Sequence, residues 1–148
     1  MTVYVLNEWV WEDCLGSNGA THQAEAARAL TSLHEGSDAI IVVKGTAFES
    51  KAWQLCRSED LLRRSIAALW KDGFFYDSKK CILRDIGRLP PLGPPLAVAV
   101  KPDDHYLVQA QASAPGSVIV TTDDPLMKVL AAHELPFLSR EDFLARLK

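Results

Sequence analysis

The sequence has little of what marks several large classes of protein. Its 148 residues carry a formal net charge of only −3, and no apolar run approaches the roughly 20 residues that span a bilayer. The near-neutral charge gives no global basic field for nucleic acid, although a local patch would be enough to bind it. No GxxxxGK(S/T) or GxGxxG sequence is present, so a nucleotide-binding loop of either kind is not supported.

Cysteine and histidine are also scarce. The three cysteines (Cys14, Cys56 and Cys81) are widely spaced and form no CxxC pair, which predicts reduced thiols in a cytoplasmic protein. The four histidines lack the spacing of metal ligands, and only His105, beside an acidic pair, is kept as a minor functional alternative. Met1–Leu6 carries no basic residue, so we expect no signal peptide.

Strand-like and helix-like apolar patterns alternate along the chain. Short β-branched runs predict buried strands, and apolar residues three or four apart predict helices. The expected strands are Val3–Leu6, Ala39–Val43, Cys81–Leu83 and Val118–Val120, with Leu135–Leu138 as a short edge strand because proline cannot serve a central ladder. The expected helices are a turn at Trp9–Leu15, then Ala20–His34, one from about Thr46, one after Ser58, Asp103–Ala114, Pro125–His133 and one after Ser139. This order predicts one domain over residues 1–148, a three-layer α/β/α fold with a mainly parallel central sheet.

Some segments are harder to interpret. Leu89–Pro95 is too rich in proline for regular structure, so we expect a loop there. Leu96–Val100 fits a short strand or an extended lead-in to the next helix. Trp9 and Trp11 fit the core or a partner-facing surface, with stacking on a nucleic-acid base as the alternative.

Acidic side chains occur where several of these elements reach the edge of the sheet. Asp103 and Asp104 begin a helix, Asp123 and Asp124 follow a buried strand, and Glu49 lies in the first turns of another helix. Because the carboxyl ends of parallel strands share one edge, we expect these side chains to lie near one another. Clustered carboxylates are costly unless a cation neutralises them, and hard oxygen ligands suit Mg²⁺ or Mn²⁺.

Three segments resemble the PIN domain, the nuclease fold of many ribonuclease toxins in bacterial and archaeal toxin–antitoxin pairs. Val3–Asn7 resembles its opening strand, Pro102–Leu107 the acidic start of its late helix, and Val118–Asp123 its strand followed by Thr-x-Asp. Glu49 has the position of a helical Glu in that family, and Leu135–Leu144 resembles the closing strand and helix.

The resemblance implies a metal-dependent endoribonuclease that cleaves single-stranded RNA. It places metal-binding carboxylates at Glu49, Asp104 and Asp123, while the part played by their neighbours Asp103 and Asp124 stays open. The implied cofactor is Mg²⁺ or Mn²⁺, which would activate a water for attack on phosphorus. By analogy alone, the resemblance also implies an antitoxin partner and a homodimer, and it implies no membrane.

The opening strand departs from the family at its end, where Asn7 stands in place of the usual Asp. An amide oxygen can coordinate a cation but brings no charge, so Asn7 is expected to orient the metal or the water while binding weakens. Glu8 would point to the opposite face if the strand continued, which leaves Glu12, one turn further, as the residue to reach back. Whether the chain is an enzyme therefore stays open. The alternative is a catalytically impaired PIN-like domain that binds RNA or a protein partner.

Each acidic residue also has a purely structural interpretation. Asp123–Asp124 before Pro125 fits a helix cap, and Asp103–Asp104 fits a cap followed by an acid favoured by the helix dipole. Glu49 fits a solvated helix residue. A third functional alternative is a phosphatase or other hydrolase with Asp123 as nucleophile, which is disfavoured because the first strand has no Asp at its end.

Overall fold

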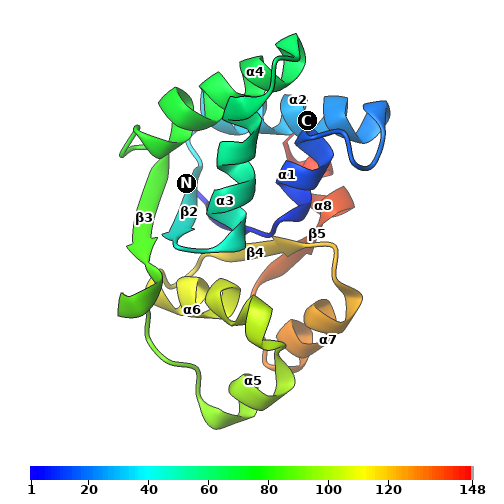
Figure 1. Cartoon of the computed structure of the whole chain (residues 1–148). Coiled ribbons are helices and arrows are strands. Elements are labelled where there is room, and N and C mark those ends of the chain that lie inside the picture. The colour runs from blue at the N-terminus through cyan, green and yellow to red at the C-terminus, as the bar shows by residue number, and fades with distance from the viewer. Residues whose placement is uncertain (148) are drawn as a thin grey trace.

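A computed structural model describes residues 1–147 as helices packed on both faces of one parallel sheet (Figure 1). The strands are β1 (Val3–Leu6), β2 (Ala39–Lys44), β3 (Cys81–Asp85), β4 (Val118–Thr121) and β5 (Phe137–Ser139). They lie in the order β3-β2-β1-β4-β5, and every neighbouring pair is parallel. The predicted α/β fold with a parallel central sheet is therefore confirmed.

Helices cover the two faces of the sheet in two groups. The α-helices of the described residues are α1 (Trp9–Cys14), α2 (Ala20–Glu35), α3 (Ala47–Gln54), α4 (Leu61–Ala68), α5 (Pro94–Ala99), α6 (His105–Ser113), α7 (Asp124–Ala132) and α8 (Arg140–Arg146). Helices α1 to α4 lie on one face with α8 beside them, and α5 to α7 lie on the other (Figure 1). A π-helical segment, η2 (Leu69–Phe75), continues α4 toward β3. None of these helices is long and apolar enough to cross a membrane.

The central strands form the core because they are covered on both faces. The five residues of β2 from Ala39 to Val43 are all buried, as expected for a parallel strand between two helical layers. Phe48 of α3 packs in an aromatic cluster with Trp11 of α1 and Trp70 of η2, with ring centroids 5.2–6.5 Å apart. Trp9 and Trp11 are 4% and 0% exposed, so neither ring is free to stack on a base.

One local prediction from the sequence is wrong. Leu96–Val100 is not extended, because α5 begins at Pro94 and runs to Ala99. Proline suits the first positions of a helix, where the missing N–H has no partner to lose. The helix after Ser58 is capped by Asp60, whose Oδ2 accepts a hydrogen bond from the Arg63 N–H at 3.0 Å.

Three helix caps are as the sequence indicates. Thr46 caps α3, Asp123 caps α7 and Ser139 caps α8, each by accepting a hydrogen bond from the backbone N–H three residues later. Each cap satisfies one of the unpaired N–H groups at the start of its helix.

The strand order fixes where a ligand can approach. From β1 the chain steps to β2 and β3 on one side, and from β3 it crosses back to β4 and β5 on the other. Ligands of open α/β sheets bind at such a reversal, beyond the carboxyl ends of the two strands that flank it. Here those strands are β1 and β4, in which Leu6 pairs with Val120. The residues that follow, Asn7 and Thr121, therefore emerge side by side.

Candidate functional site

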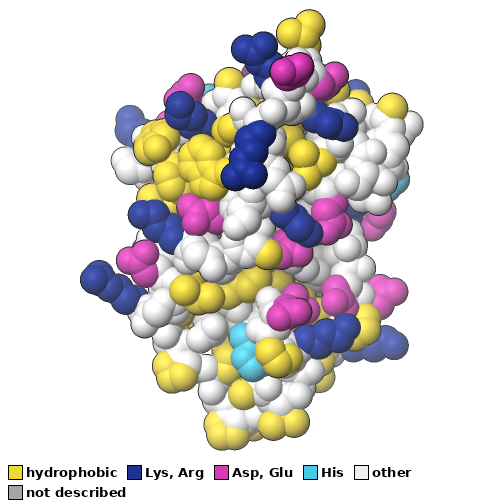
Figure 2. Space-filling model, in the orientation of Figure 1, with side chains coloured by type: hydrophobic (Ala, Val, Ile, Leu, Met, Phe, Trp, Pro, Cys, Tyr) yellow, Lys and Arg dark blue, Asp and Glu magenta, His cyan; other side chains and the backbone are white. Residues whose placement is uncertain are grey.

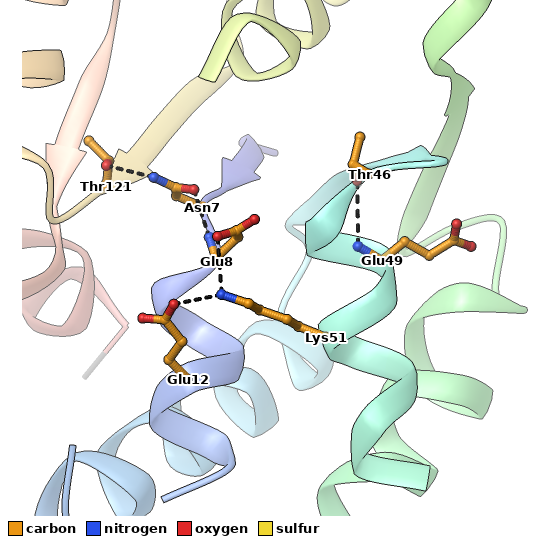
Figure 3. Close-up of polar contacts among 7 residues, drawn as sticks. All are labelled: Asn7, Glu8, Glu12, Thr46, Glu49, Lys51 and Thr121. Atoms are coloured by element: carbon orange, nitrogen blue, oxygen red, sulfur yellow. Dashed lines mark hydrogen bonds and ion pairs between the residues drawn. The ribbon is translucent and has the colours of Figure 1, made fainter. Parts of the chain in front are cut away.

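Asn7 is fixed at the reversal point by its neighbours on β4 and α1 (Figure 3). Its Nδ2 donates to the Thr121 hydroxyl at 3.0 Å, and its Oδ1 accepts from the Glu8 N–H at 2.7 Å. Thr121 is fully buried, and its Oγ1 also accepts the Asp123 N–H at 3.1 Å. One hydroxyl therefore ties the end of β1 to the turn that carries Asp123.

Asp123 and Asp104 face a common small cavity of about 100 Å³ beyond β4. Asp123 is held there as the α7 cap, with its Oδ1 accepting the Leu126 N–H at 3.1 Å. Asp104 occupies the cap position of α6 but makes no side-chain cap bond. The two carboxylates, one at the start of α6 and one at the start of α7, thus line the same cavity.

Asp104 also faces a larger cleft of about 460 Å³, which Glu8 and Asp103 line as well. The pKa of Asp104 lies above its usual value, mainly because the carboxyl is partly buried and next because Asp123, Glu8 and Asp103 repel its charge. Lys101 acts in the opposite direction but does not compensate. Figure 2 shows acidic side chains gathered across the middle of this face, between the α1 and α7 regions.

Glu8 is the residue that sequence reasoning missed. The alternation of side chains along a strand would turn it away, but the backbone of Glu8 is already helical, with φ −60° and ψ −20°. It therefore faces the cleft from the start of α1. The helical turn expected at Trp9–Leu15 is the sequence signal that could have indicated this, because the residue that begins a helix no longer follows the alternation of a strand.

Lys51 on α3 bridges the two glutamates of α1 (Figure 3). Its Nζ lies 3.2 Å from Glu8 Oε2 and 2.7 Å from Glu12 Oε1. Partial burial acts to lower the pKa of Lys51, but hydrogen bonds to Glu12 and Glu8 outweigh it and raise the pKa overall. Glu12 thus contacts an ammonium group, and Lys51 brings a positive charge to the rim of the acidic cleft.

Two of the residues assigned from the resemblance lie apart from this group. The Glu49 side chain extends away from Asn7 and Glu8 (Figure 3). Its Oε1 accepts the Gly45 N–H at 3.0 Å and its Oε2 accepts the Trp53 Nε1–H at 3.3 Å. Asp124 is exposed at the start of α7 and lines neither the small cavity nor the cleft.

His105 serves the connection between α5 and α6. Its Nε2 lies 3.1 Å from the Ala97 carbonyl oxygen and 2.8 Å from that of Val100. Nε2 must carry hydrogen to bond these two acceptors, so the ring links the two helices on the floor of the site.

The oxygen atoms of the site are of the kind that bind a hard cation, but their arrangement fits such a cation only in part. Carboxylate and amide oxygens are the ligands that Mg²⁺ prefers, but no group of three or more His, Cys, Asp and Glu side chains in residues 1–147 is arranged to hold a metal ion. Mg²⁺ commonly keeps several waters and uses only one or two protein carboxylates. Asp104 and Asp123 can supply that number.

Fold and site together define a three-layer α/β/α protein with an acidic site at its strand reversal. Comparison with models of protein families, with curated proteins and with solved structures finds no match to this chain.

Proposed function

We propose that this chain is a PIN-like ribonuclease that cleaves single-stranded RNA with the help of Mg²⁺ or Mn²⁺. One observation carries the proposal. Asp104 shares the small cavity with Asp123 and the larger cleft with Glu8 and Asp103. Carboxylates from three distant segments therefore gather at the point of the sheet where an α/β protein binds its ligand.

In this proposal Asp104 and Asp123 hold the cation. A bound Mg²⁺ or Mn²⁺ supplies charge neutralisation of the phosphodiester and a water of lowered pKa. Asn7 keeps the end of β1 against Thr121, and its amide oxygen accepts the Glu8 N–H. Lys51 partly neutralises Glu8, which limits the repulsion that an incoming phosphate meets.

A catalytically impaired domain that binds RNA or a protein partner is the second candidate. Asn7 brings no charge to the site, and Glu49 is engaged with Gly45 and Trp53. Both features remove anionic ligands that the PIN resemblance implies. The remaining carboxylates would then serve binding without cleavage.

Further parts of the proposal rest on the resemblance alone. They are a role as the toxin of a toxin–antitoxin pair, a cognate antitoxin and a homodimer. A cytoplasmic location is proposed on different grounds, because the free thiols of Cys14, Cys56 and Cys81 agree with a reducing compartment.

The deciding experiment incubates the purified full-length chain with labelled single-stranded RNA in Mn²⁺, Mg²⁺ or EDTA. We expect cleavage that needs the cation. Its rate should fall at least a hundredfold in Asp104→Asn and in Asp123→Asn, because each substitution removes one negative charge from the ligands of the cation. Asn still caps helices well, so Asp123→Asn should fold. Asp72→Asn, at an exposed carboxylate on η2, is the matched control. Cation-independent cleavage, or equal cleavage by all variants, would refute the enzyme.

Retained RNA binding without cleavage under any cation would instead favour the second candidate. Calorimetric titration with Mn²⁺ separates the two further, because the enzyme requires cation binding that both asparagine variants weaken.

A further inference from the structure

Tyr106, the second residue of α6, has a buried hydroxyl that makes no hydrogen bond within the described residues. The residue is only 8% exposed, so water does not readily satisfy the group. A buried polar group without a partner destabilises the folded chain. Such a cost needs an explanation, and a missing ligand is one.

The position of Tyr106 points to the acidic cleft. Tyr106 lines the same 460 Å³ cleft as Glu8 and Asp104. Burial is the main cause that raises the pKa of the phenol, and the charges of Glu8 and Asp104 raise it further. A phenol carries its hydrogen at neutral pH even without such a shift, so Tyr106 can donate a hydrogen bond.

The other buried groups without partners lack this setting. The indole nitrogens of Trp11 and Trp70 lie in the aromatic cluster of the core. The unpartnered atom of Gln111 is its acceptor Oε1, and Arg63 on α4 has an unpartnered Nε, but neither residue lines the acidic cleft. Among these groups, Tyr106 combines a free donor with a cleft lined by carboxylates.

A ligand of this cleft therefore needs both positive charge and a hydrogen-bond acceptor. The carboxylates of the cleft attract positive charge and repel a bare anion, whereas the phenol needs an acceptor oxygen. A phosphodiester accompanied by a divalent cation supplies both. The cleft volume falls within the range of about 300–1,000 Å³ typical of ligand sites.

We propose that Tyr106 donates its hydroxyl hydrogen to a phosphate oxygen of a single RNA strand held in the cleft between α1 and α6. This inference rests on the proposed function and adds a substrate-binding residue to it. A phosphate contact positions the strand without reading its bases. Tyr106 should therefore matter equally for strands of different sequence.

The test measures the Kd of fluorescent oligouridine and oligocytidine in Ca²⁺ and in EDTA. We expect Tyr106→Phe to raise Kd about tenfold for both strands in Ca²⁺, because one hydrogen bond to a charged acceptor is lost. Tyr76→Phe, at a tyrosine 67% exposed on the surface, should leave Kd unchanged. Mn²⁺ affinity, measured by calorimetry without RNA, should be the same in Tyr106→Phe and the unaltered chain.

Folding should not complicate this test. Phenylalanine keeps the ring and removes the unpaired hydroxyl, so the urea midpoint of Tyr106→Phe should stay the same or rise. Equal Kd for the unaltered chain and Tyr106→Phe, including no binding by either, overturns the inference. A changed Mn²⁺ affinity with an unchanged RNA affinity also overturns the inference. The phenol would then affect cation binding by the carboxylates and would not contact the RNA. RNA binding that depends on Tyr106 in a chain that does not cleave would refute the nuclease and leave this inference standing.

Discussion

Asp13 and Asp104 are two carboxylates of this protein with opposite surroundings. Asp13 is 1% exposed and fully partnered: its Oδ2 accepts the Arg140 Nε–H at 2.8 Å and its Oδ1 accepts from Asn18 Nδ2 at 2.7 Å. Arg140 also reaches Glu25 at 3.5 Å and lies 5.7 Å from the centre of the Trp9 ring. This network joins α1, α2 and α8 and has a structural role.

Asp104 has the reverse environment. It forms none of the ion pairs found in residues 1–147, and three other carboxylates raise its pKa. A partnered buried charge holds a fold together, whereas a half-buried charge among like charges costs stability and is explained by a ligand. The comparison separates an acid that joins helices from the acid that the proposed function uses.

The largest expected effect is a loss of stability when the buried Asp13–Arg140 ion pair is removed. Arg140→Ala leaves the Asp13 carboxylate buried without its partner, so unfolding free energy should fall by about 3–5 kcal/mol. Urea unfolding followed by tryptophan fluorescence measures this. The loss should be the same with and without Mn²⁺. A loss below 1 kcal/mol would show that Asp13 is not as isolated from water as its surroundings indicate.

The next largest effect is a change in Mn²⁺ affinity at the proposed site of Asp104. Asn7→Asp adds a unit charge beside Asp104 and Asp123, so Mn²⁺ affinity should rise about tenfold, equivalent to about 1.4 kcal/mol. The Thr121 hydroxyl can donate to the new carboxylate and still accept from Asp123. Calorimetric titration checks the affinity, and RNA cleavage should increase with it. Unchanged affinity would mean that residue 7 does not face the cation.

A smaller effect concerns the ammonium group at the rim of the cleft. Lys51→Met keeps most of the side-chain stem but frees Glu8 and Glu12, so Mn²⁺ affinity should rise about threefold through the added negative charge. The gain should shrink at high salt, because these groups are only partly buried. Lys71→Met, at an exposed lysine on η2, is the control. Weaker Mn²⁺ binding would contradict this electrostatic account.

The smallest effect is a change in stability with pH. Because its pKa is raised in the folded chain, Asp104 favours the folded state when protonated, and that contribution is lost as pH rises above the ordinary aspartate value of 3.8. In EDTA at neutral pH, Asp104→Asn should therefore be slightly more stable, by less than about 1 kcal/mol because solvent screens the site. Thermal unfolding from pH 4 to 7 tests this. A less stable variant would show that the carboxylate stabilises the fold.

Local signals in the sequence predicted most of the fold correctly. Apolar β-branched runs identified the central strands β1, β2 and β4, since burial on both faces favours such residues. Asp123 was recognisable as a cap because Asp before a helix accepts the N–H three residues later. The same local view failed at Leu96–Val100, where two prolines start α5.

The sequence alone determined the order of strands and helices and the presence of carboxylates at the ends of several of them. Only the tertiary structure decided which carboxylates share a cavity. The hydrogen bond from Asn7 to Thr121 and the reach of Lys51 across to Glu8 join residues 114 and 43 positions apart. Hydrophobic periodicity is a property of neighbours along the chain, whereas electrostatic surroundings depend on distance in space, and the pattern of one does not encode the other.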